Sequence, residues 1–308
     1  MMCIAIIRLA DSDLSVNQLV ADSAGRIGMS GERGQLSEAR GDIGRPGGAS
    51  LGPEAAADPL FIAAVERAMR VLEIVSHRHA PMSLTEIAAA SGLGKSAAQR
   101  LTHTLAALGY LSKDPETRRY AVTVRALDLA HGFLSADPLT NAGLLHLIDT
   151  REACGETINM GRLEGTDFIY TARLPARRAN VASALVGRRQ PAYCASGGRA
   201  MMSRMSPDDV ARLLDARSLA ALTPMTLTDR DQVLERIDQA RREGFAATDQ
   251  EVLMGELAVS AAITDRDGRP IGAVQGSVST ASWTLDRVRA ELAPKVMEAA
   301  RLISAPRY

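Results

Sequence analysis

The sequence predicts an α+β protein in two parts, a small helical unit that ends in a β-hairpin and a larger unit that mixes hairpins with helices. Three observations predict this. Helical periodicity dominates residues 59–108, β-type runs around two glycine-containing turns stand out in residues 156–279, and 308 residues suit about two domains. A hydrophobic content of 46% is enough for a real core.

Composition excludes several classes of protein. Net charge indicates no particular partner, because Lys+Arg and Asp+Glu both number 36, although residues 61–130 carry nine basic and six acidic residues. Cys3, Cys154 and Cys194 lack C-x-x-C spacing, so we expect no disulfide framework, no zinc site and a reducing cytoplasmic location. The first residues lack a signal peptide's basic n-region, and no window reaches the ~18 apolar residues of a membrane span.

Residues 1–57 are expected to form a disordered, glycine-rich tail. Nine glycines fall within residues 25–52, and no apolar face recurs there at a helical period. Such a segment cannot bury enough apolar surface to offset the entropy lost on ordering. We therefore expect the folded unit to begin near Asp58-Pro59.

The first folded segment, residues 59–77, places Ile62, Val65, Leu72 and Val75 on one face at a helical period. Two shorter helical stretches follow within residues 83–111, separated at Gly92. Two short β-like runs follow, with Asp-Pro-Glu-Thr between them. Proline is favoured at the second position of a β-turn, so this sequence predicts a turn and the runs predict a hairpin.

The stretch GLGKSAAQRL, residues 92–101, has two opposed interpretations. Gly94-Lys95-Ser96 matches the end of a phosphate-binding loop, G-x-x-x-x-G-K-[ST], which would suit an ATPase. That loop needs a preceding buried strand and a glycine five residues before Gly94, where this chain has Ala89. The preceding LTEIAAA is alanine-rich and predicts a helix, so the nest of N–H groups that holds a phosphate would not form.

A helix-turn-helix fits the same stretch better. Thr85–Ala90 would form the first helix and Ser91-Gly92-Leu93 would form the turn. The second helix would follow, and the side chains facing the core would be Leu93, Ala97, Leu101 and Leu105. The outward side chains would then be Lys95, Ser96, Gln99, Arg100 and His103. Such groups suit the major groove of DNA, and a hairpin carrying Arg118-Arg119 suits a wing that contacts phosphate or the minor groove. An ordinary helical hairpin with a solvated polar face remains the alternative.

The second part begins with two helices in residues 123–153, between which Asp137-Pro138 predicts an N-cap and a first-turn proline. Hairpins are predicted at residues 156–174, turning at Glu164–Asp167, and at residues 256–279, turning at Asp267-Gly268. Between them we expect a strand at 179–186 and capped helices at 206–216 and 228–244. A C-terminal helix at 284–304 should be kinked by Pro294.

A candidate ligand site begins at Ser196-Gly197-Gly198, which opens a helix directly after an extended stretch. Two glycines would let a ligand approach backbone N–H groups at the positive end of the helix, where an anion or a carboxylate is favoured. A tight strand-to-helix turn without a ligand remains the alternative. Gln275 and Ser277 alternate on one strand and should face the same side, where polar groups indicate a ligand or bound water.

We expect no catalysis, no metal and no cofactor. Cys194 has no nearby histidine or basic partner to lower the pKa of its thiol, and CASGG misses the nucleophile elbow G-x-S-x-G. The five histidines all precede the predicted sheet and lack metal-ligand spacing: His77, His79, His103, His131 and His146.

The stretch LTEIAAASGLGKSAAQRLTHTLAALGYLSKDPETRRYAV, residues 84–122, resembles the winged helix of the IclR family of bacterial transcription regulators. That family typically has a Leu-Pro-Lys-Ser/Thr turn, an Arg-Leu in the recognition helix and a wing like DPETGRY. This chain has Gly94 in place of the proline and Arg119 in place of the glycine. The resemblance implies that double-stranded operator DNA contacts Lys95, Ser96, Ala97, Gln99, Arg100, His103, Arg118 and Arg119.

ETINMGRLEGTDFIYTARL, PAYCASGGRA, TDQE and DGRPIGAVQGSVS resemble blocks of the IclR effector domain, a GAF-like antiparallel sheet with flanking helices that holds a small molecule. The resemblance implies effector contacts at Ser196, Gly197, Gly198, Thr248, Asp249, Glu256, Ala258, Gln275 and Ser277. PAYCASGGRA and TDQE look most like the subgroup that senses aromatic acids such as hydroxybenzoates. That subgroup usually has Gly-Leu-Arg-Ser where this chain has Gly255-Glu256-Leu257-Ala258, and a buried Glu256 would repel a second carboxylate.

The resemblance implies a cytoplasmic, ligand-responsive transcription regulator with a tail at 1–57, a winged helix-turn-helix at 58–121, a linker helix at 122–136 and an effector-binding domain at 137–308. It would sense a small organic acid, aromatic acids included, and control a catabolic operon as a homodimer or a dimer of dimers, without a membrane contact. The acid would change the spacing of two recognition helices. The competing interpretation is a stand-alone small-molecule-binding protein whose helical unit only dimerises.

Overall fold

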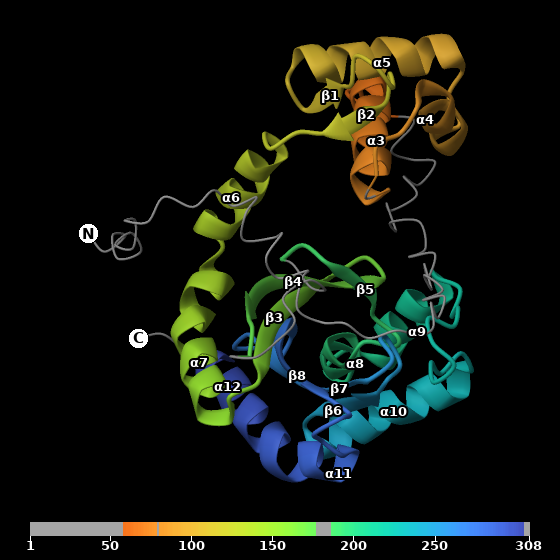
Figure 1. Ribbon diagram of the computed structural model, residues 1–308. Helices are drawn as coiled ribbons and strands as arrows, with labels where there is room; N and C mark the ends of the chain where they lie inside the picture. The colour runs from red at the N-terminus through yellow and green to blue at the C-terminus, as the bar shows by residue number, and fades with distance from the viewer. Residues whose placement is uncertain (1–57, 79, 177–185, 305–308) are drawn as a thin grey trace, which may run out of the picture. The chain divides into compact units, whose positions relative to one another are not determined.

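The computed structural model describes residues 58–78, 80–176 and 186–304. The predicted tail, residues 1–57, and nearly all of the strand predicted at 179–186 lie outside the described residues. Within them the α+β class is confirmed, because helices accompany one two-stranded and one six-stranded sheet (Figure 1). No helix in the described segments is long and apolar enough to cross a membrane.

The first folded part is a helix-turn-helix followed by a hairpin. Its elements are α3 (Ala63–His77), α4 (Leu84–Ser91), α5 (Lys95–Ala107), β1 (Leu111–Lys113) and β2 (Tyr120–Val122). Ser83 and Glu86 close a capping box at the start of α4, and Gly92 ends that helix in the left-handed conformation with φ +69°. Because α4 is a helix and not a strand, the phosphate-loop interpretation is wrong.

The buried face of α5 includes most of the predicted one and extends beyond it. Leu105 is buried as predicted, and Leu93 and Leu101 pack partly buried against the same core. Ala98 and Thr102 are also buried, which the prediction missed, whereas Ala97 is only half-buried. Thr102 can lie inward because its hydroxyl donates to the carbonyl of Ala98 at 2.9 Å.

Two helices follow the hairpin, as the sequence predicts. They are α6 (Ala126–Ala136) and α7 (Pro138–Cys154). Asp137 caps α7 by accepting a hydrogen bond from the backbone N–H of Thr140 at 3.0 Å. The linker helix begins at Ala126 rather than at residue 122, because Val122 still pairs with Leu111 in the hairpin.

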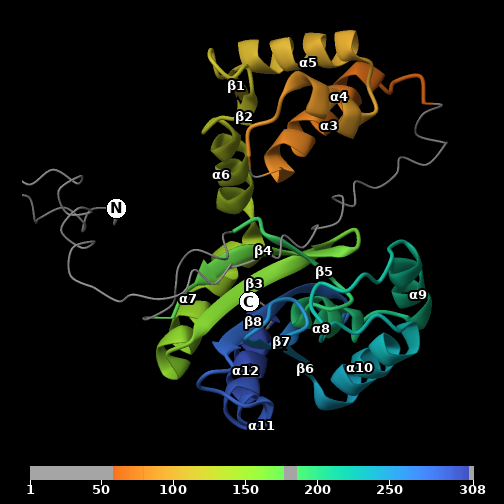
Figure 2. The same cartoon turned by 45° about the vertical axis from the view of Figure 1, so that its right-hand side comes forward.

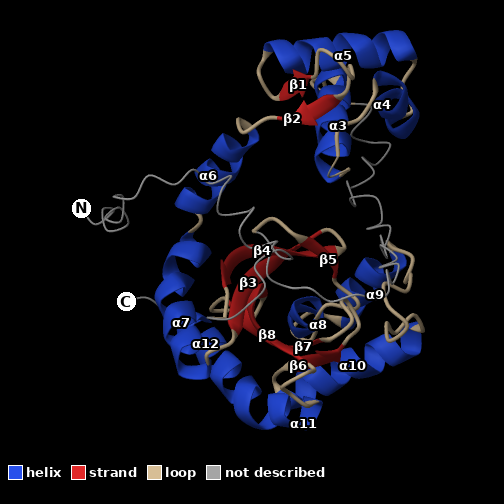
Figure 3. Cartoon of the chain, in the orientation of Figure 1, coloured by secondary structure: helices blue, strands red, loops and turns tan. Residues whose placement is uncertain are grey.

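The larger part is built on a curved antiparallel sheet with the strand order β5-β4-β3-β8-β7-β6. Its strands are β3 (Thr157–Glu164), β4 (Asp167–Leu174), β5 (Arg189–Pro191), β6 (Ala246–Asp249), β7 (Glu256–Thr264) and β8 (Pro270–Ser279). The pairs β3–β4 and β7–β8 are the two predicted hairpins, and β3 pairs with β8 at the centre. The sheet curls around α8 (Ser196–Met202), as Figure 3 shows.

Helices cover both faces of this sheet. α8 packs in the concave face, with α9 (Pro207–Asp215) and α10 (Arg230–Glu243) beside it, and α7 and α12 (Ala293–Ser304) pack on the opposite face (Figure 2). The predicted C-terminal helix is interrupted rather than simply kinked: α11 (Leu285–Arg287) runs into a π-helical turn at Val288–Leu292 before α12. Pro294 accounts for this turn, because it lacks an N–H and its ring crowds the preceding turn.

Candidate DNA-binding face and effector site

α5 presents a polar face to solvent. The exposed side chains on it are Lys95, Ser96, Gln99, Arg100 and His103. Their outward orientation matches the prediction, because Ala98 and Leu105 hold the opposite side in the core. Gly94 precedes the helix without a side-chain cap, so the first backbone N–H groups remain available to an anion. The face therefore combines donors that can contact base edges with cations that can contact phosphates.

The two wing arginines have different environments. Arg118 is exposed in the turn with φ +58°. Arg119 donates through Nη1 to the carbonyl of Pro81 at 2.9 Å and to Glu86 Oε2 at 3.0 Å. Because Glu86 also closes the capping box of α4, Arg119 ties the wing to the start of that helix. Arg119 thus anchors the wing, and its phosphate contact stays a prediction.

A row of buried polar side chains crosses the concave face of the sheet. The strand register sets Asn159, Gln275 and Ser260 side by side on β3, β8 and β7, and each is at most 1% exposed. Gln275 Nε2 donates to Ser196 Oγ at 3.0 Å, and the hydroxyls of Ser196 and Ser260 are 2.8 Å apart. Gln275 Oε1 accepts from Tyr170 Oη at 2.5 Å and from Asn159 Nδ2 at 3.2 Å. These bonds fix the orientation of the row, since buried polar groups are costly without partners.

Charged side chains lie beside this row. Arg173 is opposite Asn159 in the sheet and donates to its Oδ1 at 3.1 Å. Glu256 begins β7 on the face that carries Ser260 and is partly buried. Burial raises the pKa of the Glu256 carboxyl above its usual value, and the positive charges of Arg188 and Arg173 partly oppose that shift. The expected repulsion between Glu256 and an acid is therefore offset by two guanidinium groups.

The concave face carries most of the predicted effector residues. They are Ser196, Thr248, Glu256, Ala258, Gln275 and Ser277. Asp249 does not join them, because it pairs with Leu257, whose side chain lies in the core on the opposite face. The prediction missed the polar residues that the neighbouring strands add to the face: Asn159, Tyr170, Arg173 and Ser260. Tyr170 and Arg173, three residues apart, share this face because a β-bulge lies between them, and Asn159 and Ser260 join it through strand pairing; neither the bulge nor the pairing is visible in the sequence.

Gly197 and Gly198 allow close packing rather than ligand access. A Cβ atom on Gly197 would lie 2.4 Å from Phe168 Cζ, and one on Gly198 would lie 2.3 Å from the carbonyl oxygen of Ala192. Both glycines are buried. The open approach predicted for a ligand at these glycines is wrong, because an aromatic ring and a neighbouring backbone occupy the space. The tight strand-to-helix turn is the interpretation that fits them.

A buried ion pair holds α8 against the segment that precedes β7. Arg199 is 0% and Glu251 is 7% exposed, and the guanidinium donates to both carboxylate oxygens at 2.6 Å. Arg199 Nε also donates to the carbonyl of Tyr193 at 2.6 Å, and Thr226 Oγ1 donates to the carbonyl of Glu251 at 2.6 Å. The pair thus fixes α8 to the segment between β6 and β7.

The chemistry around Cys194 does not activate it. Cys194 is fully buried, and burial raises the pKa of its thiol to about 12. A thiol with a raised pKa is a poor nucleophile at neutral pH. Within residues 58–78, 80–176 and 186–304, no group of His, Cys, Asp and Glu is arranged to hold a metal ion.

Two family models match the chain in the order that the sequence predicts. The IclR helix-turn-helix domain matches residues 64–115, and the C-terminal domain of the bacterial transcriptional regulator IclR matches residues 133–305. The chain belongs to the IclR family. This IclR-family protein is therefore a transcription regulator with a DNA-binding helix-turn-helix and an effector-binding domain. The stand-alone binding protein is not favoured, because the helical unit matches a DNA-binding model.

Known relatives of this IclR-family chain are similar to it over most of their length. The Pca regulon regulatory protein of Pseudomonas putida is 29% identical over 79% of this chain and 84% of its own. A solved transcriptional regulator from Rhodococcus sp. RHA1 is 28% identical with a TM-score of 0.67 and covers 79% of this chain and 97% of its own. An IclR homologue from Microbacterium hydrocarbonoxydans, complexed with 4-hydroxybenzoate, shares the fold with a TM-score of 0.63 at 20% identity. The match covers 78% of this chain and 97% of that homologue.

Proposed function

We propose that the polar face of α5 enters the major groove of an operator in the cytoplasm, where Arg100 and Gln99 contact base edges and Lys95 and Arg118 contact phosphates. The observation that carries this is the exposure of these side chains on a helix whose opposite face is fully packed. Arginine suits guanine and glutamine suits adenine, and cations at the helix start and wing suit the backbone. Direct base contact by Arg100 makes the binding sequence-specific.

The test measures binding to a duplex from the region upstream of the protein's own gene. Arg100→Ala should weaken this binding by about 1–3 kcal/mol and relax selectivity, whereas Lys95→Ala should weaken all duplexes alike and lower the salt slope by about 1. Arg301→Ala is the matched control, because Arg301 is an exposed arginine on α12. Equal operator affinities for Arg100→Ala and Arg301→Ala would refute the assignment.

We further propose that the effector is a small organic acid that binds on the concave face, with its carboxylate toward Arg173 and Arg188. The observation that supports this is the presence of two guanidinium groups against the single carboxylate of Glu256, beside the buried polar row. Charge-assisted hydrogen bonds from arginine favour a carboxylate. The same fold holds 4-hydroxybenzoate in the Microbacterium homologue, so that acid is the first candidate.

Calorimetric titration with 4-hydroxybenzoate and with its neutral amide tests this proposal. Arg173→Gln should weaken binding of the acid about tenfold or more, because it removes a charged donor. Arg301→Gln, which changes an exposed arginine elsewhere, should bind like the wild type. Equal binding of acid and amide, or an unchanged affinity in Arg173→Gln, would contradict an acid-binding site at these residues.

We propose that α6 mediates self-association of the chain into a homodimer. None of its side chains is buried, and Leu127, Leu129 and Phe133 are 63%, 56% and 51% exposed. A second copy would cover this apolar surface, whose exposure to water is unfavourable. Light scattering should give twice the chain mass for the wild type and a lower mass for Phe133→Glu. A monomeric wild type, or an unchanged mass in the variant, would rule out this interface.

A further inference from the structure

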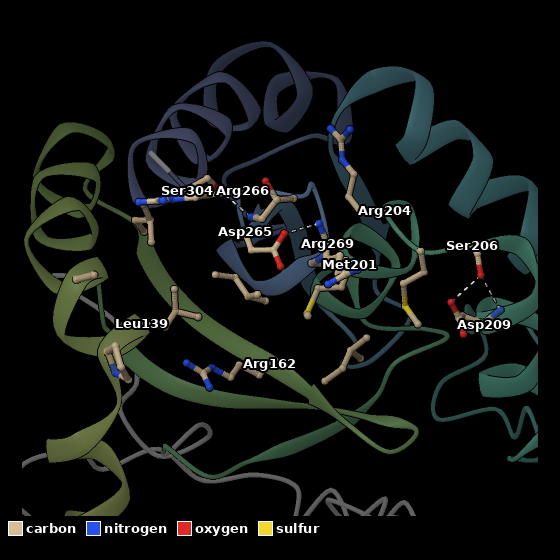
Figure 4. Close-up of a pocket in the computed structure, with 18 residues that line it drawn as sticks. Leu139, Arg162, Met201, Arg204, Ser206, Asp209, Asp265, Arg266, Arg269 and Ser304 are labelled. Carbon is tan, nitrogen blue, oxygen red and sulfur yellow. Dashed lines mark hydrogen bonds between the residues drawn. The ribbon is translucent and has the colours of Figure 1, made fainter. Parts of the chain in front are cut away.

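A pocket lies in the larger part, at an end of the sheet, and none of the predicted effector residues lines it. Its volume is about 960 Å³. It is bounded by the first turn of α7, the end of β3, the end of α8, the β7–β8 turn and the end of α12 (Figure 4). Met201 of α8 lines this pocket, whereas Ser196 at the other end of the same helix belongs to the polar row. The two sites are therefore separate.

The lining of this pocket is rich in arginine. It includes Arg162, Arg204, Arg266 and Arg269, drawn from different elements, and only two carboxylates, Asp209 and Asp265. Both carboxylates are already engaged: Asp209 pairs with an arginine of α9, and Asp265 accepts backbone N–H groups within its own turn. Arg162 and Arg269 pair with Asp137 and Asp267 outside the lining, whereas Arg204 and Arg266 have no ion-pair partner among the residues described and supply the unpaired charge. The pocket thus carries an excess of positive charge.

Arg162 joins the pocket to the start of α7. Its side chain is 33% exposed, and its Nη2 donates to Asp137, the residue that caps α7. Its Nε is buried and out of reach of a ligand, so an anion would meet the exposed part of the guanidinium. An anion in the pocket would bond the same guanidinium that holds the break between α6 and α7.

The floor of the pocket is apolar. Leu139, Met201 and Ile303 are buried beneath it, and Ile271 at its rim is 39% exposed. An inorganic anion would leave this surface in contact with water, whereas a ligand with a hydrocarbon body would cover it. We propose that this pocket binds an amphipathic organic anion, a carboxylate with an apolar body of several carbons, as a second ligand of the regulator.

Calorimetric titration of the full chain with octanoate tests this proposal. Octanoate should bind more tightly than hexanoate, by up to about fourfold per added methylene, because the floor covers the chain. Arg204→Gln/Arg266→Gln should weaken octanoate about five- to tenfold, since two cationic contacts are lost. Neutral octanamide should bind the wild type as weakly as octanoate binds that variant.

Two matched variants separate this pocket from other sites. Arg242→Gln/Arg301→Gln removes the same charge from exposed arginines outside the pocket and should leave octanoate binding unchanged. Arg173→Gln disables the proposed effector site and should also retain octanoate binding. Because Arg204 and Arg266 are exposed, their variants should keep the wild-type melting temperature. The proposal is overturned if octanoate does not bind, if octanamide binds equally well, or if Arg173→Gln rather than Arg204→Gln/Arg266→Gln abolishes binding.

Discussion

Gly197→Ala should destabilise the larger domain, although alanine is usually the better helix residue. The new Cβ would lie 2.4 Å from Phe168 Cζ and 2.5 Å from its Cε1, well inside the roughly 3.5–4.0 Å of an optimal carbon contact. Overpacking of this kind costs about 1–3 kcal/mol, which exceeds the about 0.5–1 kcal/mol gained by replacing a helical glycine. We therefore expect a net loss of roughly 1–2 kcal/mol, or a fall of about 2–8 °C in melting temperature.

Thermal unfolding of single and double variants isolates this contact. Phe168→Leu removes the ring atoms nearest to the new Cβ, so the Gly197→Ala penalty should shrink in that background. Gly94→Ala before α5 is the control, because nothing lies within 4 Å of the added atom, its φ of −62° suits alanine, and no comparable loss is expected. The packing argument fails if Gly197→Ala melts like the wild type, or if its penalty is the same with leucine at position 168. If Gly197→Ala kept the wild-type stability but no longer bound the effector, Gly197 would be a position that a ligand approaches.

Three further predictions concern ion pairs and buried charge. Arg119→Ala should lower the melting temperature of the helix-turn-helix part more than Arg118→Ala does, because only Arg119 bonds Glu86 and the Pro81 carbonyl. Equal shifts in the two variants would show that Arg119 does not anchor the wing. Arg199→Met should cost about 3–5 kcal/mol in urea unfolding, since it leaves Glu251 buried without its partner, and Arg199→Met/Glu251→Leu should recover part of that loss. Burial raises the pKa of Glu256 in the folded protein above 4.5, so folding disfavours its charged form. The free energy of unfolding of the wild type should therefore fall as the pH rises from 4.5 through the folded pKa. Glu256→Gln should not show this pH-dependent loss of stability. If the melting temperatures of both proteins shift equally between pH 4 and pH 8, the buried charge at Glu256 is refuted as the cause.

Local signals in the sequence were enough to predict most of the fold. Gly92 and Asp137 mark helix ends through backbone chemistry that depends only on neighbouring residues, and both hairpins turn where predicted. The inward face of α5 is predicted at Leu105 but not at Thr102, because a polar side chain lies inward only through its hydrogen bond to the Ala98 carbonyl. The order of the six strands could not be predicted from the residues, because it depends on contacts between distant segments.

The site was harder to predict than the fold. Gln275 and Ser277 were identified because their alternation places them on one face, but Asn159 joins Gln275 only through the pairing of β3 with β8. Gly197 was misassigned, because a glycine at a helix start looks the same in sequence whether it faces a ligand or a ring. The charge around Glu256 is not predictable from its own segment, since Arg173 and Arg188 act on it from another strand and a neighbouring turn.

If an acid on the concave face controls DNA binding by α5, the affinity for DNA must respond to the acid only while the acid site is intact. Fluorescence anisotropy of the upstream duplex, titrated with the wild type and with Arg173→Gln in the presence and absence of 4-hydroxybenzoate, tests it most directly. We expect equal DNA affinities for the two proteins without the acid, and a change in DNA affinity on adding the acid for the wild type alone. An affinity that the acid leaves unchanged in the wild type, or shifts equally in both proteins, would contradict it.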